Sequence, residues 1–238
     1  MTDRVVLPSS VVPSHYNLVL TPDLNALSFH CEETIEVAIS EATTVVTMHC
    51  KEINVTDASF KNISSGVGPS VVQIAYHLKD NTVSLTFDEE LPLGEGVIAL
   101  SFDGILNGDM AGFYKSGYTD ADGNKKVMAS TQFEALDARR AFVCWDEPAR
   151  KATFSLTMIV PSDLTAISNM PASVTTIMAG GKKRVVFDHS PKMSTYLLAW
   201  AVGEFDYIQG ITKHGVTIRI FTPPGRAEEG KFALDTGK

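Results

Sequence analysis

The sequence predicts an all-β domain, an antiparallel β-sandwich or saddle with the start of a short helix near its C-terminal end. Three observations support this fold class. Apolar and polar residues alternate with a period of two along most of the chain. Short runs rich in glycine, asparagine and aspartate separate the alternating segments. The chain has 238 residues, a length at which all-β architectures often form a single domain.

Several alternating runs predict individual strands. They cover residues 29–39, 72–78, 82–88, 126–134, 152–160 and 216–220. In the first run, every residue on one face is apolar except Glu33. The predicted turns lie at residues 79–81, 94–96, 122–124 and 180–181. The basic run at 182–184 is interpreted as a solvated hairpin tip.

The last residues break the strand pattern. Pro223, Pro224 and Gly225 end the final strand, because proline cannot donate to a sheet ladder. Residues 227–234 then predict the first two turns of a helix with an acidic start. The sequence offers this helix nothing to pack against, so we expect a boundary to another domain here.

The composition is that of a soluble globular protein: 44 % hydrophobic and 20 % charged residues. The net charge of −8 argues against a nucleic-acid partner. The longest apolar run, residues 196–202, is far too short to span a membrane, and Pro8 and Pro13 interrupt any signal-like segment. Three cysteines, an odd number, favour free thiols and a cytoplasmic location.

The histidines predict no metal site in this chain. No two of the six have the i, i+4 spacing of an H-E-x-x-H helix. The G-x-S-x-G elbow of serine hydrolases is also missing from the sequence. The spacing therefore predicts no zinc site of this kind in the chain, while a Ser-His-Asp arrangement stays open, because spacing alone does not exclude it.

One stretch, residues 131–154, holds four acidic and four basic side chains in 24 residues. On the predicted strand 126–134, Gln132 and Glu134 lie on the same face with Cα atoms about 6.5–7 Å apart. An amide beside a carboxylate suits a cation that also needs a hydrogen-bond acceptor, such as the α-ammonium group of a peptide. These two residues are the candidate substrate-binding pair.

The other charged residues of the stretch are interpreted as an ion-pair network that holds an irregular loop on the sheet. They are Asp137, Arg139, Arg140, Asp146 and Glu147. Phe142 and Trp145 are expected to be core anchors, and Cys144 a small buried apolar residue.

Two alternative functions stay open at this point. One is a hydrolase with two carboxylates, Glu134 with Asp137 or Glu147, which would be active without further residues. The other is a carbohydrate-binding sandwich, which would require a row of exposed aromatic residues. Aromatic residues make up only 8 % of the chain and are scattered.

Several motifs in register carry a resemblance to a known family. They are TQFEALDARRAFVCWDEPARKATF, Leu7-Pro8 with His15-Tyr16-Asn17-Leu18, Met110 to Ser116, Met193 to Ala199, Val202 to Phe205, and Thr222 to Leu234. The chain resembles, over nearly its whole length, the N-terminal domain of the gluzincin zinc metallo-aminopeptidases, and among these the puromycin-sensitive subgroup. One departure is Val143, where the subgroup usually has proline.

The resemblance implies that residues 1–222 form an N-terminal β-saddle domain and that residues 223–238 begin a thermolysin-like catalytic domain. The family's G-A-M-E-N and H-E-x-x-H segments do not occur in this sequence. By resemblance, the zinc and the catalytic residues would therefore lie in the parent protein outside this chain, with no catalytic residue among these 238. Glu134 would bind the free N-terminus of peptide substrates and Gln132 would line the pocket for the first side chain. The parent's own catalytic domain would be the partner of this face and of the helix.

Overall fold

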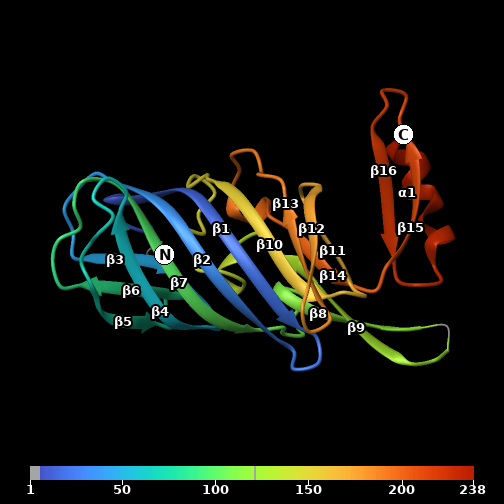
Figure 1. Ribbon diagram of the computed structural model, residues 1–238, viewed down its shortest axis with the longest axis horizontal. Helices are drawn as coiled ribbons and strands as arrows, with labels where there is room; N and C mark the ends of the chain where they lie inside the picture. The colour runs from blue at the N-terminus through green and yellow to red at the C-terminus, as the bar shows by residue number, and fades with distance from the viewer. Residues whose placement is uncertain (1–5, 121) are drawn as a thin grey trace, which may run out of the picture.

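The computed structural model describes residues 6–120 and 122–238, and it confirms the all-β class with one short C-terminal helix. Figure 1 shows a large sheet crossing the body of the molecule, with smaller sheets behind its two ends. The large sheet has the order β12-β13-β10-β1-β2-β7-β4. Its strands are β1 (Val11–Asp23), β2 (Ser28–Ile39), β4 (Ile53–Asn62), β7 (Gly94–Ile105), β10 (Thr153–Pro161), β12 (Ala172–Met178) and β13 (Lys182–Phe187).

Two smaller sheets complete the saddle. A three-stranded sheet contains β3 (Val45–His49), β5 (Val71–His77) and β6 (Thr82–Phe87). A four-stranded sheet contains β8 (Gly112–Thr119), β9 (Lys125–Gln132), β11 (Thr165–Ser168) and β14 (Trp200–Gly203). Short 3-10 turns occur at η1 (Ala138–Arg140) and η2 (Thr195–Leu197).

Among the strands of the described residues, pairing is antiparallel except for β1 with β10, which run parallel from His15 opposite Thr153 to Leu20 opposite Met158. Parallel neighbours require a long crossover, and here the connection runs through eight other strands and the charged stretch. The alternation that predicted the strands matches their burial. Tyr16, Leu18 and Leu20 on β1 are fully buried, while the residues between them are half-buried.

Two predictions about turns are wrong. Residues 94–96, predicted as a turn, begin β7, with Gly94 and Gly96 paired with Ile39 and Val37. Glycine at 96 is required by packing, because a Cβ there would lie 2.3 Å from the ring of Phe60. The basic run at 182–184 lies within β13 and not at the hairpin tip, which falls on the two preceding glycines.

The C-terminal α-helix begins four residues later than predicted, and it does have a packing partner. A 3-10 turn, η3 (Ala227–Gly230), precedes α1 (Lys231–Gly237). Both pack on the hairpin of β15 (Asp206–Ile211) and β16 (Thr217–Thr222), where Leu234 is buried. Figure 1 shows this hairpin and α1 beside each other, at one end of the molecule. The domain boundary after residue 222 stays a prediction.

Candidate functional site

The candidate pair lies where β9 ends. The strand was predicted to continue to Glu134, but it ends at Gln132. Phe133 turns into the core, 2 % exposed, and packs against Trp200 and Phe142 with ring centroids 5.3 and 6.0 Å away. The chain then turns, with the Asp137 amide donating to the Phe133 carbonyl oxygen at 3.0 Å. Glu134 therefore sits in an exposed turn that is anchored by a buried aromatic ring.

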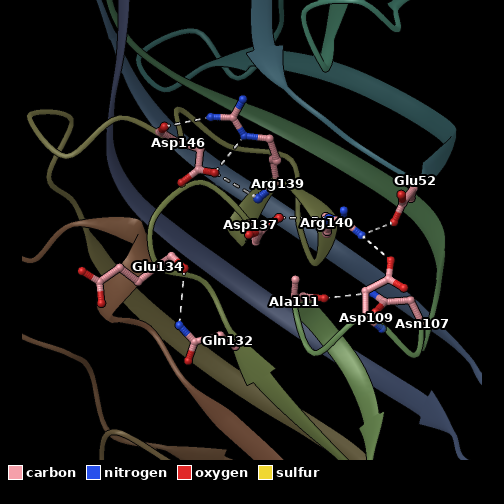
Figure 2. A network of polar contacts seen from close by, with 10 residues as sticks. All are labelled: Glu52, Asn107, Asp109, Ala111, Gln132, Glu134, Asp137, Arg139, Arg140 and Asp146. Atoms are coloured by element: carbon pink, nitrogen blue, oxygen red, sulfur yellow. Dashed lines mark hydrogen bonds and ion pairs between the residues drawn. The ribbon is translucent and has the colours of Figure 1, made fainter.

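Gln132 and Glu134 are neighbours, but their side chains are not bonded to each other. The amide nitrogen of Gln132 donates to the backbone carbonyl oxygen of Glu134 at 3.4 Å. Figure 2 shows the Glu134 carboxylate extending away from that amide. Both side chains are exposed, and within the described residues the carboxylate of Glu134 has no hydrogen bond or ion pair. It is available to a cation from outside the chain.

Arg139 and Asp146 form a buried ion pair, as the network interpretation predicted. The Arg139 Nε donates to Asp146 Oδ2 at 2.9 Å, and Nη2 donates to the Asp146 carbonyl oxygen at 3.1 Å. The side chains are 9 % and 1 % exposed. The second carboxylate oxygen accepts from the Thr195 hydroxyl at 2.7 Å, and the Asp146 amide donates to His49 Nδ1 at 3.1 Å. These contacts join the loop to β3 and to the η2 turn.

Arg140 is the centre of a second ion-pair group (Figure 2). Its guanidinium lies 2.9 Å from Glu52, 3.3 Å from Asp109 and 2.9 Å from Asp137. Asp109 is placed by its own loop, in which the Asp109 amide donates to Asn107 Oδ1 at 2.8 Å. Glu52 and Asp109 were missed by the sequence reasoning, since no local pattern links them to residue 140.

Glu147 is engaged as well. Its Oε1 accepts from the backbone amide of Leu7 at 2.8 Å, and its Oε2 lies 3.6 Å from Arg150 Nε. Both acids proposed as second carboxylates, Asp137 and Glu147, are thus held by arginines. Neither Asp137 nor Glu147 is therefore a free carboxylate that could act with Glu134 in a two-carboxylate hydrolase.

The uncharged residues of the stretch are core residues, as expected. Phe142 and Trp145 are 0 % and 1 % exposed. Burial, and next the nearby Asp146, raises the pKa of the Cys144 thiol well above its ordinary value, which leaves it protonated and unreactive. Of the exposed large apolar side chains, the aromatic ones are Tyr76, Tyr207 and Phe232, which lie on β5, β15 and α1 and form no row.

No group of three or more histidine, cysteine, aspartate or glutamate side chains converges as a metal site in residues 6–120 and 122–238. The zinc ion that the family resemblance implies therefore has no matching donor set among these residues. In the same residues no helix is both long and apolar enough to cross a membrane.

The described residues form an all-β saddle with one exposed, unpaired carboxylate just after β9. The profile of the Peptidase M1 N-terminal domain matches residues 12–197. The chain belongs to this family, as its resemblance indicated.

Several relatives are similar over almost all of this chain. Aminopeptidase M1-C of Oryza sativa subsp. japonica is 46 % identical over 231 residues, which cover 97 % of this chain and 26 % of the relative. Aminopeptidase M1 of Arabidopsis thaliana is 44 % identical over 233 residues, with coverage of 97 % and 26 %. Puromycin-sensitive aminopeptidase of Caenorhabditis elegans is 42 % identical over 230 residues, with coverage of 96 % and 24 %. The chain therefore spans about a quarter of the length of these relatives.

Proposed function

We propose that this chain is the N-terminal domain of a zinc aminopeptidase that removes N-terminal residues from peptides, and that it supplies the group that binds the substrate's free N-terminus. The observation that carries the proposal is the state of Glu134. It is exposed and unpaired, while the neighbouring acids Asp137, Asp146 and Glu147 are each held by an arginine. The relatives named above are aminopeptidases by name, and they support the reaction class.

In this proposal the Glu134 carboxylate accepts hydrogen bonds from the α-ammonium group of the substrate. An ammonium group has three donors and no acceptor, so a free carboxylate complements it in both charge and hydrogen bonding. Gln132, two residues earlier at the end of β9, lines the space for the first side chain. Zinc would be bound by the parent outside these residues. A cytoplasmic location is proposed as well, and the three buried free thiols support it. Cell fractionation is the test of this location, because one relative carries the name Aminopeptidase 2, mitochondrial.

The test is Glu134→Gln in the longer protein that carries this domain. The substitution keeps the shape and removes the charge. A hydrogen bond to a charged group contributes about 1.5–3 kcal/mol, so kcat/KM for peptides with a free N-terminus should fall roughly ten- to 150-fold. N-acetylated peptides lack the ammonium group, and their slow turnover should hardly change.

Two results would contradict the proposal. Equal losses for free and acetylated peptides would show that Glu134 does not bind the N-terminus. A lower melting temperature with unchanged kinetics would instead indicate a structural ion pair. The matched control is Glu95→Gln, an exposed glutamate at the start of β7, which should change neither quantity.

A further inference from the structure

Arg140 contacts the turn that carries Glu134 and the strand that pairs with Gln132. Its side chain is only 12 % exposed, although it carries a full charge. Its three carboxylate partners come from three separate segments. Glu52 follows β3, Asp109 lies in the loop between β7 and β8, and Asp137 closes the turn that carries Glu134. One guanidinium therefore joins the Glu134 turn to two other loops.

The aliphatic part of Arg140 lies on the strand next to Gln132. Gly112, the first residue of β8, pairs with Gln132 in the sheet. A Cβ built on Gly112 would lie 2.5 Å from the Cβ of Arg140, a distance that no side chain tolerates. Gly112 also has a left-handed φ of +73°, which favours glycine. The stem of Arg140 thus rests directly on the backbone that holds Gln132 in register.

On the basis of the proposed function, we infer that Arg140 is the positioning residue of the amine-binding pair, fixing the Glu134 turn through Asp137 and the Gln132 strand through Gly112. The aromatic core beneath this turn does not depend on Arg140, since Phe133 and Phe142 pack on Trp200. Loss of the guanidinium should therefore displace the exposed turn more than it unfolds the domain.

Three substitutions separate the charge of Arg140 from the packing of its stem. Arg140→Met keeps much of the stem and removes the charge, which leaves Glu52, Asp109 and Asp137 to repel one another. Arg140→Lys keeps the charge, but a single ammonium cannot reproduce the planar fork that contacts three carboxylates from two sides. Lysine should therefore rescue only part of the loss. Gly112→Ala displaces the stem without changing any charge.

The first measurement uses this chain of 238 residues. Amide hydrogen exchange should become faster in the turn of residues 133–137 and at the start of β8 in Arg140→Met, while the core strands β1 and β2 keep their protection. The control is Arg150→Met, because Arg150 contacts Glu147 at 3.6 Å and no part of the pair. Unchanged exchange in the turn, or a uniform rise across the domain, would overturn the inference.

The second measurement uses the longer protein. A displacement of about 1 Å can cost up to about 100-fold in rate, so Arg140→Met should lower kcat/KM for free-amine peptides about 10–100-fold. N-acetylated peptides should be affected little, Gly112→Ala should give the same pattern, and Arg150→Met should have no effect. Since Arg140 positions both Glu134 and Gln132, adding Arg140→Met to Glu134→Gln should cause less loss than the sum of the two single losses, because only the effect on Gln132 remains.

These results separate the inference from the proposed function. If Glu134→Gln discriminates free from acetylated peptides but Arg140→Met does not, only the inference is wrong. Additive losses in the double variant would also overturn it. If Glu134→Gln itself fails to discriminate, the proposed function fails, and the assignment of Arg140 to an amine-binding pair fails with it.

Discussion

The buried pair of Arg139 and Asp146 offers the sharpest test of how the charged stretch is held in place. In Asp146→Asn the guanidinium of Arg139 stays buried and keeps two acceptors on residue 146, the backbone carbonyl oxygen and the new amide oxygen, but it loses its negatively charged partner. The new amide nitrogen can donate to the Thr195 hydroxyl, so the substitution removes the charge and leaves the hydrogen bonds possible. Removing one partner of a buried ion pair costs about 3–5 kcal/mol, because the other charge is left uncompensated.

Urea unfolding of this chain, followed by tryptophan fluorescence, measures the loss of unfolding free energy directly. Thermal unfolding is the second measurement. Each kcal/mol lost should lower the melting temperature by about 2–4 °C in a domain of this size, so the total fall should be about 6–20 °C. The matched control is Asp109→Asn. Asp109 is 67 % exposed and 3.3 Å from Arg140, and the change should cost at most about 1 kcal/mol.

A loss below about 1 kcal/mol in Asp146→Asn would refute the reasoning, since it would mean that water or relaxation compensates Arg139. The double variant Arg139→Met with Asp146→Leu gives a second check. It removes both charges, so it should be more stable than Asp146→Asn alone. A double variant that is less stable than the single one would show that the pair itself does not explain the loss.

Two further predictions concern buried titratable groups. Burial, and next the nearby Arg139, lowers the pKa of His49 to about 3, so the folded state binds fewer protons than the unfolded state below pH 6.5. Stability should therefore fall as the pH drops from about 6.5 towards 3; an unchanged slope in His49→Asn, from urea midpoints, would contradict this. Glu33 is buried, and neither carboxyl oxygen has a hydrogen bond of good geometry to a described residue; burial raises its pKa, and the nearby backbone amide of Val143 offsets this only in part. Glu33→Leu should stabilise the chain by roughly 1–3 kcal/mol at pH 7, and a lower urea midpoint would refute that expectation.

The sequence predicted the strands well because burial on one face imposes the alternation that the residues show. Glu33 illustrates this: it interrupts the apolar face of β2 in the sequence, and the structure buries it on that face. The parallel pairing of β1 with β10 was not predictable in the same way. It joins segments about 140 residues apart, and alternation carries no information about which strands become neighbours.

The site was predictable in part for similar physical reasons. Spacing by two placed Gln132 and Glu134 at one edge, but it could not show that the ring of Phe133 would be drawn into an aromatic cluster and end the strand. The partners of Arg140 were out of reach of sequence reasoning. Glu52 is 88 residues away from it along the chain, and only the fold brings the two within 2.9 Å.

The charge of the stretch divides into two parts that differ in what they require. Arg139 and Asp146 satisfy each other inside the protein, so they need nothing from outside and stabilise the loop whether or not a substrate is present. Glu134 is exposed, and its carboxylate makes no hydrogen bond or ion pair with the described residues, so a cation would displace only solvent from it. The backbone of its turn is anchored by the buried ring of Phe133 and ends at the ion pair of Asp137 with Arg140. In the proposed site, binding would therefore order the exposed side chain but little of the backbone, which is why a paired loop suits one free acid.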